Sequence, residues 1–174
     1  LGAQVAGFKG VDKRLDLLAS AIKREGSIHE LTEFEHAYAP PFSSAKDPVN
    51  IAGFVAENIL LGQLSLFYWN EVEEIKDKGV IIDVRSREEF NKAHIPGAVS
   101  FPIDELRSHL EELRKYPEIS LYCQVGLRGY LAYRILKQSG FKKVKNLSCG
   151  FTTWQACHNE TMIGEKEKLA LAMA

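Results

Sequence analysis

One cysteine of this chain lies in a sequence that could make its sulfur a nucleophile. Cys123 directly follows the apolar run of residues 119–122, and a helical pattern begins a few residues later. A strand, a tight loop and a helix N-terminus would surround the sulfur with backbone N–H groups and the positive helix end, which stabilise a thiolate. We therefore predict a nucleophile, against the alternative that Cys123 is a buried small hydrophobe. The residues of the loop are Gln124, Val125, Gly126, Leu127 and Arg128.

Short apolar strands that alternate with helices must position this loop. Residues 80–84 and 119–122 read as buried parallel strands, and residues 144–147 as a third. The alternation predicts an α/β fold, with a parallel sheet covered by helices on both faces. Helices are expected at residues 88–93, 103–116, 128–138 and 151–156.

The first part of the chain follows another pattern, mostly helical with a proline-rich loop. Ser27 and Glu30 have the spacing of a capping box, and Asp47 followed by Pro48 marks the start of a further helix. We expect a partial domain at residues 1–64, an α/β domain at 65–157 and a C-terminal tail at 158–174.

Composition and charge exclude several classes of partner. With 45% hydrophobic residues and a net charge of −1, the chain can bury a core and has no electrostatic reason to bind nucleic acid or anionic lipid. The apolar stretch 51–69 carries polar interruptions and predicts a packed helix, not a membrane span. Its large residues Ile51, Phe54, Val55 and Ile59 share one helical face. None of the three cysteines forms a C-x-x-C pair, so we expect no metal site and a reducing cytoplasm.

Segments between residues 67 and 154 carry a family resemblance. They are, in order, Asp83-Val84-Arg85, Glu89-Phe90, Ala93-His94-Ile95-Pro96-Gly97-Ala98, Pro102, the loop from Cys123 to Arg128, and Gly150 with Trp154. Together they resemble a rhodanese, the sulfurtransferase domain. The resemblance implies that Cys123 takes sulfane sulfur from a donor, becomes a persulfide and passes the sulfur to a thiol or other acceptor.

The same resemblance implies roles for the residues around Cys123. Backbone N–H groups of the loop would hold the outer sulfur, and Arg128 would fix the loop. Asp83, Arg85 and His94 would support the backbone around it, with a catalytic Asp83–His94 dyad as the less favoured reading. A phosphatase of related architecture needs Cys-x5-Arg, whereas Arg128 comes at Cys-x4-Arg, which favours sulfur over phosphate.

Two departures from the rhodanese pattern bear on the donor. Gln124 stands where many members have arginine, so a cation that would meet thiosulfate is missing and we expect thiosulfate to be a poor donor. Cys149 replaces one of the usual paired glycines. We expect Cys149 and Cys157 to be core residues, with a resolving or second sulfur-carrying thiol as the alternative.

Residues 1–62 resemble the end of the dimerisation domain of FAD-dependent pyridine nucleotide-disulfide reductases, in the branch that reduces coenzyme A disulfide or persulfides and bears a fused rhodanese. Three segments carry the match: residues 1–4, 10–14 and 38–50. The resemblance implies a longer, homodimeric parent that binds FAD, NAD(P)H and coenzyme A, with Tyr38 directed toward the partner subunit's redox cysteine. Tyr38 could instead simply pack in its loop. The chain lacks G-x-G-x-x-G, so we expect no flavin or nicotinamide site in it.

Two rival functions stay open, a non-catalytic sulfur-binding or dimer-positioning module and a cysteine-dependent phosphatase or arsenate reductase. A further hypothesis concerns Lys142, Lys143 and Lys145, which are either a solvated face or a site for the phosphates of coenzyme A.

Overall fold

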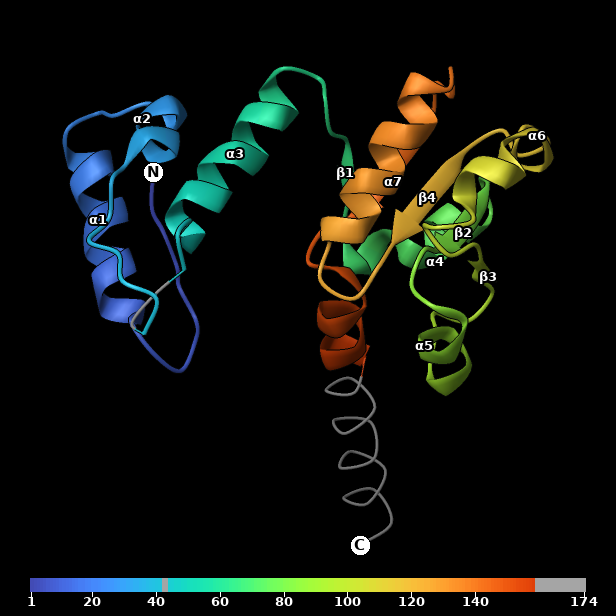
Figure 1. Ribbon diagram of the computed structural model, residues 1–174, viewed down its shortest axis with the longest axis horizontal. Helices are drawn as coiled ribbons and strands as arrows, with labels where there is room; N and C mark the ends of the chain where they lie inside the picture. The colour runs from blue at the N-terminus through green and yellow to red at the C-terminus, as the bar shows by residue number, and fades with distance from the viewer. Residues whose placement is uncertain (42–43, 159–174) are drawn as a thin grey trace, which may run out of the picture. The chain divides into compact units, whose positions relative to one another are not determined.

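The computed structural model describes residues 1–41 and 44–158, so the tail expected at 158–174 lies outside them apart from its first residue. The chain divides into two compact units, Leu1–Gln63 and a second unit that begins at Leu64 (Figure 1).

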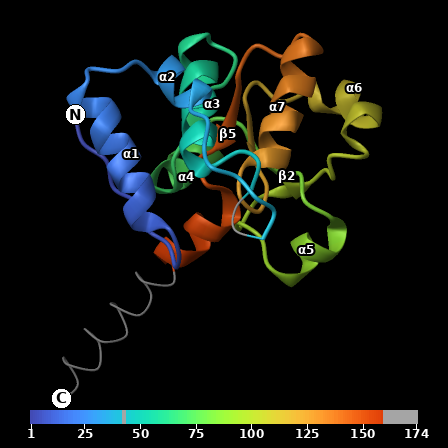
Figure 2. The ribbon, with the colours of Figure 1, turned by 60° about the vertical axis from the view of Figure 1, so that its left-hand side comes forward.

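The described part of the first unit, residues 1–41 and 44–63, contains three helices: α1 (Val11–Lys23), α2 (Ile28–Glu33) and α3 (Pro48–Leu60) (Figure 2). The predicted start of α3 is confirmed, because the Asp47 carboxylate accepts a hydrogen bond from the backbone N–H of Val49 at 3.0 Å. The side chain of Asn50 donates to the carbonyls of Leu31 and Phe34, which ties α3 to the end of α2. Ser27 precedes α2 as expected, but its side chain makes no capping hydrogen bond.

The apolar face predicted to pack on α3 is wrong for three of its four residues. Ile51, Val55 and Ile59 are exposed, whereas Val49, Asn50 and Gly53 are buried. A Cβ atom at Gly53 would lie 3.0 Å from side-chain atoms of α2. The missing side chain therefore lets α2 approach, and the approach decides which face of α3 is covered.

A five-stranded parallel sheet forms the second unit, in the order β1-β5-β4-β2-β3. The strands are β1 (Leu66–Phe67), β2 (Val80–Asp83), β3 (Val99–Ser100), β4 (Ile119–Tyr122) and β5 (Val144–Leu147). The connections hold η1 (Trp69–Glu71), α4 (Val72–Lys76), α5 (Arg87–Lys92), η2 (Leu106–His109), α6 (Leu110–Leu113) and α7 (Leu127–Gln138). A last helix begins at residue 150 and reaches residue 158, where the description ends.

Alternate residues of the strands feed two separate cores, one on each face of the sheet. Val80 and Ile82 of β2 pack with residues of α7 and η2, whereas Ile81 packs with Val72, Ile75 and Trp154 from the helices of the other face. The predicted α/β architecture, a parallel sheet with helices on both faces, is thus confirmed. Since all strands are parallel, the segments after β2, β4 and β5 meet at one edge, which we call the carboxyl edge.

The helix expected at residues 103–116 is shorter and irregular. A 3-10 turn, η2, precedes the single turn of α6. The hydroxyl of Ser108 donates to the carbonyl of Glu105, as does its backbone N–H, and this local bonding favours the tighter turn.

Candidate active site at Cys123

Cys123 lies at the centre of the carboxyl edge, directly after β4. Its residue is only 1% exposed, and its Sγ accepts a hydrogen bond from the backbone N–H of Gly126 at 3.2 Å. Gly126 has a φ of 111°, a left-handed conformation that glycine adopts without strain, and it precedes the first turn of α7. The loop therefore turns an N–H group and the positive end of a 12-residue helix toward the sulfur.

The side chain of Arg128, at the end of the loop, is bound by Glu89 of α5. Two hydrogen bonds of 2.6 and 2.7 Å join the guanidinium to the two carboxylate oxygens of Glu89. The Glu89 carboxylate also accepts from the backbone N–H of Ser86, which completes the capping box of α5. The hydrogen bonds from Arg128 lower the pKa of Glu89 from 4.5 to about 2, so the pair stays ionic in neutral solution.

A buried ion pair supports the loop from the side of β2. Asp83 is 0% and Arg85 is 3% exposed, and Arg85 donates to both oxygens of Asp83. The same guanidinium donates to the side-chain carbonyl of Gln124 at 3.0 Å and to the backbone carbonyl of Ala93 at 2.7 Å. Arg85 thus connects β2, the α5 end and the cysteine loop.

The start of the last helix, which follows β5, closes the other side of the loop. The backbone N–H groups of Phe151 and Thr152 donate to the carbonyls of Cys123 and Gln124. The side chain of Gln124 donates to the Thr152 hydroxyl at 2.8 Å. Gln124, predicted as a loop residue and noted for the arginine it replaces, therefore bridges Arg85 to the start of the last helix.

A further supporting residue, Asn146 of β5, was missed in the sequence. Its buried side-chain amide donates to the carbonyl of Gly126 at 3.2 Å and so holds the residue whose N–H bonds the sulfur. Glu89 was quoted in the sequence as part of a motif, but its pairing with Arg128 was not foreseen. The available signal was its capping-box position, three residues after Ser86.

Among the described residues, His94 contacts Phe90 and makes no hydrogen bond or ion pair with Asp83. Its ring stacks on Phe90 with centroids 3.9 Å apart, and its Nδ1 lies 3.0 Å from the carbonyl of Phe90. The Asp83 carboxylate is bound by Arg85, so the geometry gives an Asp83–His94 dyad no support. His94 belongs to the structural surroundings of α5.

The two other cysteines differ in burial. Cys149 is exposed and adopts a left-handed φ of 58° in the turn after β5, so the expectation that it is a core residue is wrong. Cys149 and Gly150 both adopt left-handed φ values, which turn the chain between β5 and the last helix and leave the Cys149 side chain on the surface. Cys157 is half-buried in the last helix.

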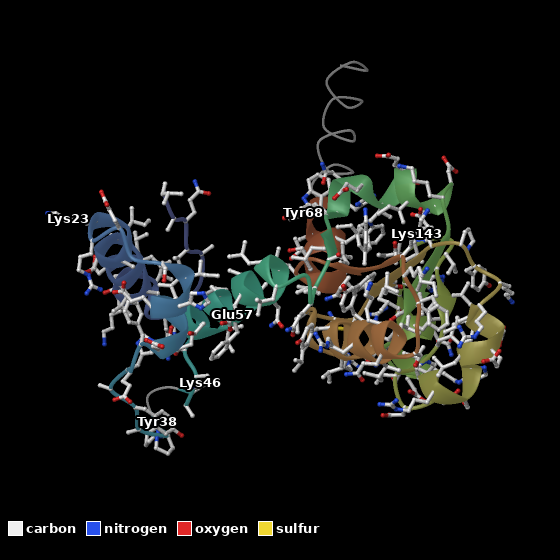
Figure 3. The ribbon with its side chains drawn as sticks, turned by 90° about the horizontal axis from the view of Figure 1, so that it is seen from above. Lys23, Tyr38, Lys46, Glu57, Tyr68 and Lys143 are labelled. Carbon is white, nitrogen blue, oxygen red and sulfur yellow. The ribbon has the colours of Figure 1, made fainter. Side chains whose placement is uncertain are left out.

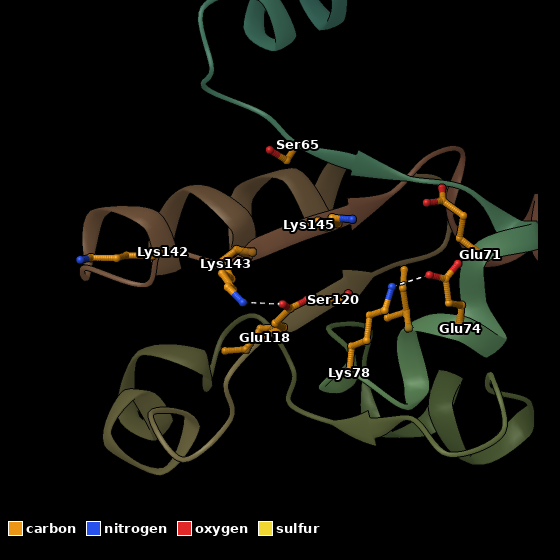
Figure 4. A pocket seen from close by; sticks show the side chains of 12 residues that line it. Ser65, Glu71, Glu74, Lys78, Glu118, Ser120, Lys142, Lys143 and Lys145 are labelled. Atoms are coloured by element: carbon orange, nitrogen blue, oxygen red, sulfur yellow. Dashed lines mark hydrogen bonds and ion pairs between the residues drawn. The ribbon is translucent and has the colours of Figure 1, made fainter.

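The lysine cluster lies at the opposite edge of the sheet from Cys123. Lys142, Lys143 and Lys145 lie just before or within β5 and line a cavity of about 310 Å³ together with Glu71, Glu74 and Glu118 (Figure 4). Lys143 pairs with Glu118 at 2.7 Å. The interleaved carboxylates and the distance along the strands favour a solvated, mixed-charge face over a phosphate site serving Cys123.

Tyr38 belongs to the first unit, in the segment between α2 and α3 (Figure 3). Its side chain is about half exposed. The packing alternative for Tyr38 is therefore met only in part, and a role toward a partner subunit stays a prediction.

Comparison with known proteins gives the same family for the second unit and extends to the first. The model of the rhodanese-like domain matches residues 69–157. Reduced CoADR-RHD of Bacillus anthracis is 44% identical, with a TM-score of 0.80 over 84% of this chain and 26% of that protein. An NAD-dependent persulfide reductase from A. fulgidus is 42% identical, with a TM-score of 0.74 over 85% of this chain and 26% of that protein.

One curated relative is a coenzyme A disulfide reductase of Staphylococcus haemolyticus. It is 52% identical over 59 residues, which are 34% of this chain and 13% of that protein. The chain thus spans about a quarter of the two solved proteins and a smaller share of this relative. The predicted resemblance, a rhodanese of the kind joined to such reductases, is confirmed.

The expectation that this chain holds no flavin or nicotinamide site stays a prediction. The tight turn from a strand to a helix at Cys123 carries G-x-x-G instead of the G-x-G-x-x-G that cradles a dinucleotide. Across residues 1–41 and 44–158, no group of three or more metal-ligating side chains lies together. No helix in this described part is long and apolar enough to cross a membrane.

Proposed function

This chain belongs to the family of rhodanese-like domains, and from that premise we propose that Cys123 carries sulfane sulfur as a persulfide. The observation that supports the proposal is the position of the backbone N–H group and the helix N-terminus beside the sulfur. The Gly126 N–H bonds Sγ, and the α7 N-terminus follows directly. Both stabilise negative charge on the Cys123 sulfur before the transfer, and on the persulfide whenever it loses its proton afterwards.

The atoms and electrons of this sulfur transfer balance without an external oxidant or reductant. The Cys123 thiolate attacks the outer sulfur of a persulfide donor R–S–SH, the donor S–S bond breaks, and R–S⁻ leaves with the bonding electron pair. The proton stays on the transferred sulfur, which is now Cys123–S–SH. A second thiolate, or cyanide, then attacks that outer sulfur and restores the Cys123 thiolate.

Intact-mass measurement after incubation with glutathione persulfide tests the proposal. We expect the wild-type chain to gain the mass of one sulfur atom on Cys123 and to lose it when cyanide is added. Cys123→Ser should remain unloaded, whereas the matched Cys149→Ser variant should load at the wild-type rate. A wild-type chain that gains no sulfur from any sulfane donor would favour a non-catalytic module instead.

We further propose that the chain acts within an NAD(P)H- and FAD-dependent reductase of coenzyme A disulfide or persulfides, as the part that hands sulfur to the redox cysteine. The identity of over 40% to CoADR-RHD and to the persulfide reductase, across both units, supports this. The test is the full-length protein. Its Cys123→Ser variant should oxidise NAD(P)H more slowly with a persulfide substrate, and an unaltered rate with every persulfide would contradict the proposal.

A further inference from the structure

The arginines around the cysteine loop are already matched by carboxylates. Arg85 pairs with Asp83 and Arg128 with Glu89, and Arg87 pairs with Glu105 at 2.6 Å. A cavity of about 250 Å³ opens beside Arg128, and its lining holds these three arginines and three carboxylates, Glu88, Asp104 and Glu105. The positive charge of this part of the carboxyl edge is therefore cancelled locally.

The sulfur donor must meet the loop in this electrostatic setting. Arg128 is the last residue of the cysteine loop and lies in the first turn of α7, but both ends of its guanidinium fork are occupied by Glu89. A dianion such as thiosulfate loses hydration on entering and finds no unpaired cation on Arg128 to replace it.

The exposed side chains of the loop suit a sulfur donor that carries an organic group. Val125 and Leu127 are each 66% exposed, and both belong to the loop that follows the buried Cys123. Apolar side chains beside the nucleophile contact the carbon frame of a donor and offer nothing to an inorganic oxyanion.

We propose that Glu89 determines donor specificity: by holding Arg128, it makes the Cys123 loop select organic persulfides over dianionic oxyanion donors such as thiosulfate. Glu89 is a positioning residue in this scheme, since it acts through Arg128 and touches neither sulfur. The inference rests on the proposed sulfur transfer and adds which residue sets its donor class.

The decisive variant is Glu89→Gln. Glutamine keeps an oxygen that can accept from the Ser86 N–H but no longer neutralises Arg128. With cyanide as acceptor, we expect kcat/KM for thiosulfate to rise about tenfold, while kcat/KM for glutathione persulfide changes by less than about twofold. Glu111→Gln is the matched control. It removes the same charge and frees Arg114, which bonds Ser139 at the far end of α7.

A thiosulfate-to-persulfide ratio in Glu89→Gln within about twofold of wild type would overturn the inference. The wild-type chain gives a second measurement that needs no variant. Its turnover of thiosulfate should be undetectable or nearly insensitive to salt, whereas a steep fall with rising salt would reveal an unpaired cation and contradict the proposal. Failure of every donor to load wild-type Cys123 would instead contradict the sulfur transfer itself.

Discussion

At the scale of single residues, the buried Asp83–Arg85 pair supports the cysteine loop through Gln124. Removing Arg85 would leave a buried carboxylate without its partner and free the carbonyl of Gln124. We expect Arg85→Ala to lower the free energy of unfolding by about 3 kcal/mol. Urea denaturation measures this, and Arg87→Ala is the control, because the Arg87–Glu105 pair is 61% and 44% exposed and should matter little. Equal losses in both variants would contradict the assignment.

Glu89 should make the stability of the chain depend on pH. Its pKa falls from 4.5 to about 2 in the folded state, so the unfolded state binds more protons between these values. The contribution of the Glu89–Arg128 pair is therefore complete above about pH 5 and lost as the pH falls toward 2. Urea denaturation of wild type and Glu89→Gln at about pH 7, 5 and 3 should show a stability difference that shrinks with acidity. A difference that is constant or grows would exclude this pairing in solution.

Residue roles could be predicted from the sequence where the partners are neighbours. The loop from Cys123 to Arg128 was found because its residues are contiguous and lie between a strand and a helix. The partners Glu89 and Arg128 are 39 positions apart, and their pairing exists only once the folded sheet brings α5 and the start of α7 to the carboxyl edge. Asn146 was missed for the same reason, since an asparagine within a strand gives no local signal of what it faces.

At the scale of elements, the cysteine loop packs directly against the segment that follows β5, and Gly150 permits this contact. A Cβ atom at Gly150 would lie 2.5 Å from the carbonyl oxygen of Cys123, and its φ is +64°. We expect Gly150→Ala to slow sulfur loading about tenfold or more, because it displaces the loop. Gly140→Ala is the control. Its φ of +88° costs about 1 kcal/mol in the variant, but it has open space, so loading should stay unchanged.

A Gly150→Ala chain that loads at the Gly140→Ala rate would show that the close contact does not matter.

The elements themselves were predictable in proportion to their apolar length. The central strands β2, β4 and β5 were found from continuous buried runs, whereas β1 and β3 are two-residue edge strands, too short for any periodicity. The helical pattern of residues 103–116 did not predict the 3-10 geometry, which the hydrogen bonds of Ser108 favour.

At the scale of the whole molecule, the contacts divide the chain between Gln63 and Leu64. The sequence did not reveal which face of α3 is covered. Periodicity marks an apolar stripe but not the neighbour, and α2 packs at Gly53 instead. Each unit has its own internal contacts, so destabilising one need not disturb the chemistry of the other.

Asp47 allows this independence to be tested. Its carboxylate caps α3 and binds Arg14 of α1 through hydrogen bonds of 3.0 to 3.1 Å, which together hold the pKa of Asp47 below its usual value. We expect Asp47→Ala to destabilise α3 by about 1–2 kcal/mol, visible as faster hydrogen exchange of its amides, while sulfur loading of Cys123 stays at the wild-type rate. Asp16→Ala, an exposed change on α1, should affect neither measurement. If loading slows together with the exchange in α3, the two units are energetically coupled, and the first contributes to sulfur transfer even though the residues that support Cys123 belong to the second.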